Sequence, residues 1–144
     1  MDKFSDILKD LIQDKSKSLR QIAKESGISS SQLSKYLKGT IPNVEISIKL
    51  ANYFECGLDY LYGFVDTKSH KQYCDFELDY FLENYLRMLK TNNLSHWKLC
   101  GKIGLSESCI RHWKNGETPK MSTIILIAEA LGVSLDNFIK THKN

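Results

Sequence analysis

Apolar residues recur along the chain at helical spacing, and short polar segments containing Ser, Gly or Pro separate the apolar runs. In the first run, over about residues 2–13, Phe4, Leu8 and Leu11 fall on one side of an amphipathic helix. The pattern predicts four further helices in the first half, over about 19–26, over about 30–38, from Pro42 through Phe54, and over 58–62. No segment carries the signals of a strand, so the chain is predicted to be all-α.

The residues between these helices favour helix ends. Ser18 and Ser29 can each accept a hydrogen bond from a free N–H of the helix that follows, as an N-cap does. Gly27 and Gly39 follow the second and third helices, where Gly adopts a left-handed conformation at little cost. The pattern therefore predicts where helices begin and end as well as where they lie.

The whole pattern occurs twice. Residues 18–63 align without a gap with residues 95–140, an offset of 77 that places Gly27 on Gly104. The offset also aligns Pro42 with Pro119 and Leu58-Asp59 with Leu135-Asp136. A repeat this long, present only twice, indicates a duplicated domain. We expect a first domain over 1–66, a linker over 67–74 and a second domain over 75–144.

Composition adds little that is specific. The 144 residues contain no run of 18 apolar positions, and the N-terminal segment alternates charged and apolar residues, unlike a signal peptide. We therefore expect a soluble, cytoplasmic protein without a membrane partner. The cysteines form no CxxC pair and are expected to be free thiols; they are Cys56, Cys74, Cys100 and Cys109.

Charge is more informative by position than in total. The net charge of +3 is a weak indication of nucleic-acid binding. Basic residues exceed acidic ones over 18–43 and again over 95–120, whereas acids gather on one side of the first helix, at Asp2, Asp6, Asp10 and Asp14.

Two short helices joined by a turn that contains Gly form a helix-turn-helix unit. The segments LRQIAKESGISSSQLSKYLKG and HWKLCGKIGLSESCIRHWKNG both resemble the five-helix domain of the phage Cro and cI repressor family, also called the XRE family. The tails ANYFECGLDYLYG and AEALGVSLDNFI resemble its closing segment. The resemblance implies two lambda-repressor-like domains in tandem that bind double-stranded DNA, although this fold also serves as a protein-binding module.

The resemblance also implies which residues face DNA. A reading helix enters the major groove by its N-terminal end, so its first turns reach base edges. The implied base contacts are Ser30, Ser31, Ser34 and Lys35 in the first domain and Glu107, Ser108, Arg111 and His112 in the second. The implied phosphate contacts are Ser29, Gln32, Lys38, Ser106, Cys109, Lys114 and Lys120.

Simpler interpretations compete with these assignments. Ser29 and Ser106 are expected to act first as helix caps, and Lys35 and Arg111 also fit ordinary solvated charges. Glu107 is a departure, because a carboxylate accepts a hydrogen bond from cytosine N4 but repels phosphate. The second domain therefore reads a narrower set of sites or does not bind DNA.

Aromatic residues in the two units receive different interpretations. Tyr36 and Trp113 lie one turn before a Gly and are expected in the core. Trp97 replaces Arg20 near a helix start, so we expect it on an exposed side that faces the DNA backbone or a partner.

Histidine and cysteine positions raise the question of a metal. His96 and Cys100 lie four apart on one helix, and Cys109 and His112 lie three apart on the next, which are spacings that zinc can use. However, Cys100 matches Ala23, a small buried residue, and Cys packs there as a small hydrophobe. We therefore expect no metal and no cofactor.

The helix that opens the second domain carries an extra apolar row. Leu78, Leu82 and Leu86 match Met1, Ser5 and Lys9 of the first domain and add a second apolar side. A domain of this size cannot bury both sides, so we expect an interface with the other domain or a second chain, formed by Phe76, Leu78, Tyr80, Leu82 and Leu86. The alternative is that the linker folds back over this row.

Two classes of function remain. The first is a sequence-specific DNA-binding regulator, a repressor of phage or mobile-element type, acting either as a covalent pseudo-dimer or as a homodimer through the second domain. The second is a protein-binding helix-turn-helix protein, such as an antirepressor, an antitoxin or a phage inhibitor of a host defence enzyme, which can also regulate its own promoter. An enzyme is not expected, because the sequence has no Gly-rich phosphate loop and no nucleophile with a base beside it.

Overall fold

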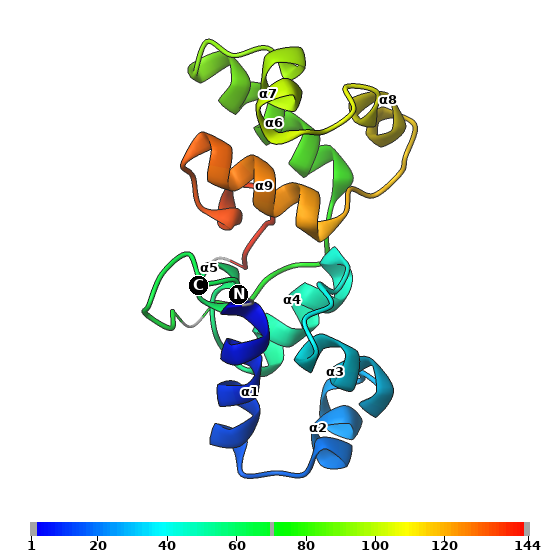
Figure 1. Ribbon diagram of the computed structural model, residues 1–144, viewed down its shortest axis with the longest axis vertical. Coiled ribbons are helices and arrows are strands. Elements are labelled where there is room, and N and C mark those ends of the chain that lie inside the picture. Colours follow the sequence, from blue (N-terminus) through cyan, green and yellow to red (C-terminus); the bar gives the residue numbers. More distant parts are fainter. Residues whose placement is uncertain (1–2, 70, 143–144) are drawn as a thin grey trace.

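The computed structural model describes residues 3–69 and 71–142, and these fold into helices in two successive halves (Figure 1). The first half contains α1 (Lys3–Lys15), α2 (Leu19–Ser26), α3 (Ser30–Leu37), α4 (Val44–Tyr53) and α5 (Leu58–Leu61). The second contains α6 (Leu78–Thr91), α7 (His96–Ile103), α8 (Cys109–Lys114), α9 (Met121–Leu131) and the 3-10 helix η1 (Leu135–Asn137). The all-α prediction is confirmed, with one isolated antiparallel bridge, between Tyr73 and Thr141, in the described part of the chain.

Helix ends in the first half follow the predicted residues closely. Ser18 accepts a hydrogen bond from the Gln21 N–H at 3.1 Å, and Gly27 ends α2 with a φ of 78°. The start of α4 differs from the prediction, because this helix begins at Val44, two residues after Pro42. Asn43 caps α4 by accepting the Ile46 N–H at 2.8 Å, and this cap was not predicted from the sequence.

Aromatic rings fill the core of the second half. The Phe81 ring lies 5.2 Å from Trp113 and 5.7 Å from Phe138, and Tyr85 lies 5.7 Å from Trp113, measured between ring centroids. Trp113 is 4% exposed and Tyr36, its counterpart, is 7% exposed, so the prediction that both are core residues is confirmed. A single cluster of buried apolar residues extends through both halves.

The two halves meet through equivalent elements, since α5 packs against η1. The Asp59 carboxylate accepts hydrogen bonds from the Leu135 N–H at 2.9 Å and from the Ser134 hydroxyl at 2.5 Å. At the matching position, the Leu58 N–H donates to the Tyr73 hydroxyl at 2.8 Å, and that hydroxyl donates to Asp136 at 2.5 Å. The start of each closing helix is therefore held by the other half or by the linker, in a nearly two-fold pattern.

The end of the expected linker is built into this joint. Tyr73 is 2% exposed, and its N–H donates to the Asn52 side chain at 2.8 Å. Cys74 N–H donates to the Lys140 carbonyl and His142 N–H donates to the Gln72 carbonyl, both at 2.8 Å. Residues 71–74 thus bind the C-terminal segment to the first half.

The apolar row of α6 is only partly covered. Phe76, Leu78 and Leu82 are half-buried against the core cluster, Tyr80 is half-buried, and Leu86 is 42% exposed. The hydrogen bonds of the joint come from other residues, so an interface through this row stays a prediction. Met1, the counterpart of Leu78 in the first half, lies outside the described residues.

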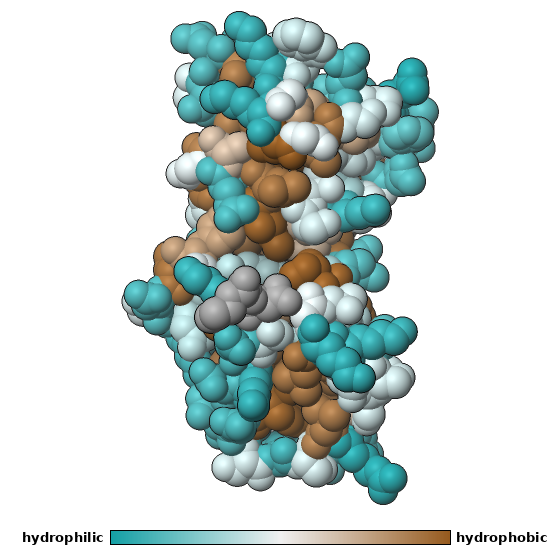
Figure 2. Space-filling view, viewed as in Figure 1, coloured by the Kyte–Doolittle hydropathy of each residue, from teal (hydrophilic) through white to brown (hydrophobic). Residues whose placement is uncertain are grey.

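Figure 2 shows apolar side chains along the middle of one face, over α9 and between α1 and α3, with polar side chains toward both edges. Leu126 of α9 contributes a side chain that is 39% exposed. None of the described helices is both long and apolar enough to cross a membrane.

Candidate nucleic-acid interface

The first helix-turn-helix unit consists of α2, the turn at Gly27 and Ile28, and α3. Ile28 in the turn and Leu33 in α3 are fully buried, which fixes α3 against the rest of the domain. Ser29 caps α3 by accepting the Gln32 N–H, while the Gln32 side-chain oxygen accepts the Ser29 N–H, both at 3.2 Å. This reciprocal pair is a capping box, which satisfies two N–H groups that a helix start otherwise leaves free.

The capping box gives Ser29 and Gln32 a structural role, in addition to the phosphate contacts that the family resemblance implies for them. The cap role expected for Ser29 is confirmed. The remaining side chains on the outer side of α3 are polar: Ser30, Ser31 and Lys35 are exposed, and Ser34 is half-buried. A rigid helix therefore presents a row of hydrogen-bond donors and acceptors to solvent.

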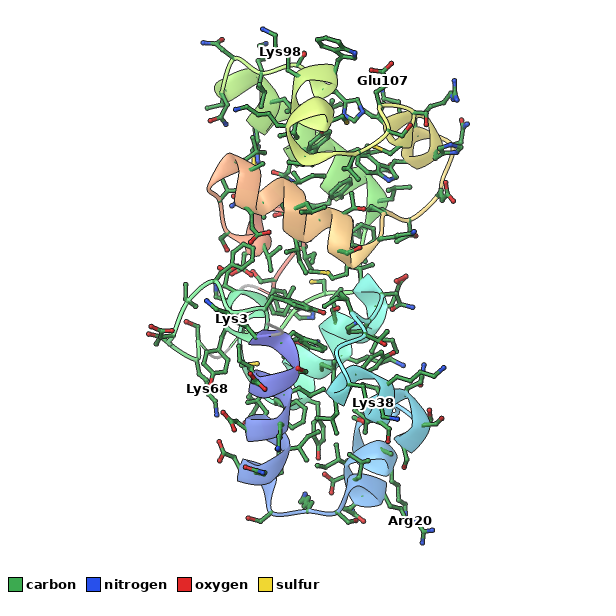
Figure 3. The ribbon with its side chains drawn as sticks, viewed as in Figure 1. Lys3, Arg20, Lys38, Lys68, Lys98 and Glu107 are labelled. Atoms are coloured by element: carbon green, nitrogen blue, oxygen red, sulfur yellow. The ribbon has the colours of Figure 1, made fainter. Side chains whose placement is uncertain are left out.

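Basic residues around α3 are available to a ligand. Lys35 and Lys38 are exposed and have no salt-bridge partner among residues 3–69 and 71–142 (Figure 3 labels Lys38). Glu25, the one acid within residues 18–43, is instead paired with Lys17 at 2.8 Å. Hydrogen bonds from Gln21, Lys17 and Tyr53 lower the pKa of Glu25 to about 2, so its charge is retained but balanced.

The acidic row of the first helix lies on a different element. Asp6, Asp10 and Asp14 are exposed along α1, and Asp14 lies 3.8 Å from the Lys68 amine. Asp2, the fourth member, lies outside the described residues. The exposed carboxylates of this row thus lie on α1, which also carries Lys3, Lys9 and Lys15, and not on α3.

The second helix-turn-helix unit differs from the first at the start of its reading helix. The repeat predicts a helix from Glu107 with Ser106 as its cap, but α8 begins at Cys109 and has no side-chain cap. The Ser106 hydroxyl instead bonds to the Ser108 hydroxyl at 2.8 Å and accepts the Ser108 N–H at 3.4 Å, within the turn that precedes α8, so its expected role as the cap of this helix is wrong. The physical reason is that Cys109 occupies the position of Gln32, and a thiol cannot close a capping box.

Glu107 and Ser108 consequently lie in a turn before the reading helix. The Glu107 carbonyl is 2.9 Å from His96 Nε2, which ties this turn to the start of α7. The Glu107 side chain is exposed, and it projects at the end of the molecule that also carries Lys98 (Figure 3). Ser108 is half-buried.

The other candidates of the second unit lie on α8, except Lys120, which directly precedes α9. Arg111, His112, Lys114 and Lys120 are exposed, but His112 Nδ1 lies 3.4 Å from the Glu117 carboxylate. Cys109 is half-buried and its Sγ is 3.9 Å from His96 Nε2, so it faces α7. Trp97 is 67% exposed, as expected, and lines a surface depression together with Glu107.

In the view of Figure 1, α3 and α8 lie in different halves of the molecule, both toward the right. The model of the family described as helix-turn-helix matches the chain twice, over residues 8–61 and over residues 87–138. The chain belongs to the XRE-type helix-turn-helix family. The two matches confirm the tandem duplication, and membership supports a DNA-binding transcription regulator. No curated protein and no solved structure matches the chain.

Cys100 has neighbours in the structure that the sequence did not reveal. Cys100 is buried, at 2% exposure, whereas Ala23, which was expected to be buried as well, is half-buried; burial raises the pKa of the Cys100 thiol to about 11. The Cys100 Sγ lies 3.4 Å from His96 Nε2 and within 4.8 Å of the Cys109 Sγ. His112 does not belong to this group of side chains. Comparing the copies gives the missing signal, because His96, Cys100 and Cys109 replace Leu19, Ala23 and Gln32.

Proposed function

We propose that this protein is a repressor of phage or mobile-element type that binds a specific double-stranded DNA sequence, with α3 as its principal reading helix. The observation that carries the proposal is the outer side of α3, where Ser30, Ser31 and Lys35 are exposed beside a capped helix start. A helix start directed into the major groove brings such side chains to base edges. Lys35 suits the O6 and N7 acceptors of guanine, and the Ser hydroxyls suit either kind of base.

The joint between the halves supports a covalent pseudo-dimer. Repressors of this fold bind as symmetric dimers, each subunit reading one half-site. Here Leu58-Asp59 and Leu135-Asp136, which are equivalent in the repeat, meet within one chain. Because α3 and α8 carry different residues, the proposed target is an asymmetric site, with the α3 half-site bound more tightly.

A protein-binding role is the second candidate, and it rests on the second unit. Its reading helix starts late, Glu107 adds a negative charge beside it, and Trp97 is 67% exposed nearby. Exposed aromatic residues are enriched where proteins bind one another. In this alternative, a protein partner binds over α7 and α8, and α3 still binds DNA.

Selection from random duplexes, followed by footprinting on DNA that flanks the protein's own gene, tests the proposal. We expect one recovered sequence and one asymmetric footprint. Lys35→Ala should weaken binding at one side of the footprint, and His112→Ala should alter only the other side. Recovery of no preferred sequence, even at about 50 mM salt where phosphate contacts are strong, contradicts DNA recognition.

A further inference from the structure

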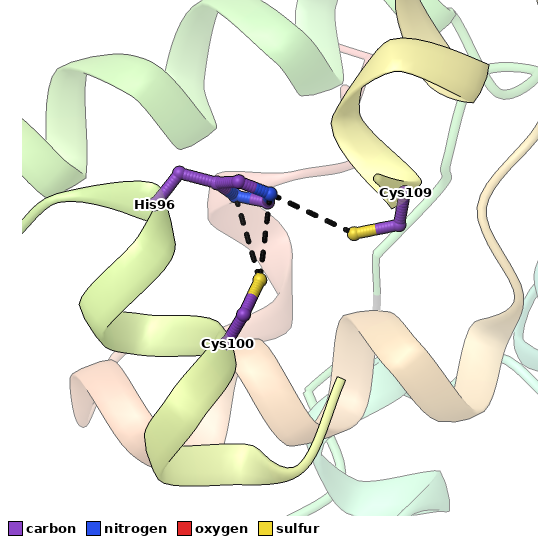
Figure 4. A group of neighbouring side chains, drawn as sticks. All are labelled: His96, Cys100 and Cys109. Atoms are coloured by element: carbon purple, nitrogen blue, oxygen red, sulfur yellow. Dashed lines mark hydrogen bonds between the residues drawn. The ribbon is translucent and has the colours of Figure 1, made fainter. Parts of the chain in front are cut away.

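We propose that the second helix-turn-helix unit is a binding site for a thiophilic metal ion, with Zn²⁺ as the ion to test, ligated by His96, Cys100 and Cys109. Figure 4 shows these side chains converging between the start of α7 and the start of α8. His96 Nε2 lies 3.4 Å from Cys100 Sγ and 3.9 Å from Cys109 Sγ. All three ligand atoms lie within 4.8 Å of one another.

These separations are close to those of a tetrahedral zinc site. Zinc binds thiolate sulfur at about 2.3 Å and imidazole nitrogen at about 2.0–2.1 Å, so neighbouring ligand atoms are about 3.5–3.8 Å apart. We expect small rotations of the Cys100 and Cys109 side chains to close the remaining gap. Two thiolates and an imidazole form a soft donor set, which favours zinc over magnesium or calcium.

The ligands are specific to the second copy. Each replaces a residue that cannot bind zinc in the first copy: His96 stands at the position of Leu19, Cys100 at that of Ala23 and Cys109 at that of Gln32. The last replacement also removes the capping box, so α8 starts without the side-chain cap that α3 has. An ion that joins Cys109 to α7 would hold this uncapped start in place.

His96 also has an outer partner, as zinc-bound histidines do, although here it is a Tyr hydroxyl in place of a carboxylate, a backbone carbonyl or water. Its Nδ1 lies 2.6 Å from the hydroxyl of Tyr85, which is fully buried, so the orientation of the ring is fixed. In binding zinc, Nε2 gives up its contact with the Glu107 carbonyl, the ring proton resides on Nδ1, and Nδ1 donates to Tyr85. The two thiol protons pass to solvent, which leaves a neutral imidazole and two thiolates on the ion.

The cluster has access to solvent. Cys100 lines a surface depression together with Trp97, Gly101 and Glu107. An ion can enter from this side, and the fourth position of the tetrahedron is left to a water molecule. Because the site adjoins the turn before α8, the ion would couple metal availability to the placement of the second reading helix.

Metal titration of the full chain tests the site without any DNA. The reduced, chelator-treated protein is titrated with Zn²⁺ against a chromophoric chelator, and with Co²⁺ to record thiolate-to-cobalt charge transfer. Cys109→Gln restores the residue of the first copy. Cys74→Ser is the matched control, since Cys74 is a half-buried thiol outside the cluster.

We expect one zinc ion per chain, a cobalt–thiolate band and a higher melting temperature with zinc, all retained in Cys74→Ser. Cys109→Gln should weaken zinc affinity by about 100-fold or more, since loss of an outer partner alone costs about 10–100-fold. Equal binding by Cys109→Gln and the unsubstituted chain overturns the site, as does a reduced chain that binds no zinc and only forms a Cys100–Cys109 disulfide on oxidation. If Cys109→Gln fails to fold by circular dichroism, the cobalt band and zinc stoichiometry of the unsubstituted chain decide the question.

Discussion

The Tyr73 hydroxyl is the single group whose loss tests the joint between the halves most sharply. It accepts the Leu58 N–H at 2.8 Å and donates to the Asp136 carboxylate at 2.5 Å. Tyr73→Phe removes both bonds and leaves the ring, which is 2% exposed, in place. The substitution therefore isolates the hydrogen bonds from the packing.

The expected cost follows from what remains after the hydroxyl is removed. Leu58 is fully buried, so its N–H is left without an acceptor, at about 1–3 kcal/mol. Asp136 keeps its contact with Lys71 and is partly exposed, so water can replace the lost donor at little cost. We expect the free energy of unfolding to fall by about 2 kcal/mol, which for a chain of this size lowers the melting temperature by about 4–8 °C.

Urea unfolding followed by circular dichroism measures this change. Tyr80→Phe is the matched control, because Tyr80 is half-buried and its hydroxyl has no hydrogen-bond partner in the part of the chain that the structure describes. The control should remain within about 0.5 kcal/mol of the unsubstituted chain. If Tyr73→Phe is equally stable, the joint does not depend on this hydroxyl and the reasoning is refuted.

Two further predictions concern the first helix-turn-helix unit. Ser29→Ala should lower the free energy of unfolding by about 0.5–2 kcal/mol because it removes a cap. Ser106→Ala should cost less, because it removes only exposed contacts with Ser108; equal losses in urea unfolding would mean that Ser106 caps α8. Glu25 has a folded-state pKa of about 2, below the ordinary value of 4.5, so it stabilises the fold above pH 4.5 and this contribution is lost as pH falls toward 2. Glu25→Gln should therefore lose less stability than the unsubstituted chain between pH 6 and about pH 3, and identical acid denaturation curves would contradict this role.

The sequence predicted those features of the fold that depend on local chemistry. Ser18, Gly27 and Ser29 mark helix ends because caps and left-handed turns are set within a few residues. The burial of Tyr36 and Trp113 followed from the repeat, since equivalent positions face equivalent cores. The late start of α8 was missed, although the replacement of Gln32 by Cys109 was visible as the loss of a capping partner.

Contacts between residues of different helices could not be predicted from the spacing of residues along the chain. Tyr73 lies in the expected linker, and only the packing of the halves places its hydroxyl between Leu58 and Asp136. The pairing of Cys109 with Cys100 depends on how α7 and α8 cross, whereas the sequence suggested Cys109 with His112. No metal was therefore expected from the sequence, because Cys100 aligns with Ala23, whereas the tertiary geometry brings a candidate metal site together.

A comparison of the DNA affinities of two lysine variants tests the central claim, that α3 reads DNA, most directly. Fluorescence anisotropy with the selected duplex and with a scrambled duplex compares Lys35→Ala with Lys9→Ala, a matched loss of one exposed positive charge on α1. Lys35→Ala should cost about 1–3 kcal/mol on the selected duplex and much less on the scrambled one, whereas Lys9→Ala should change neither. Equal affinities of the two variants for the selected duplex, at every salt concentration, would contradict the assignment of α3 as the reading helix.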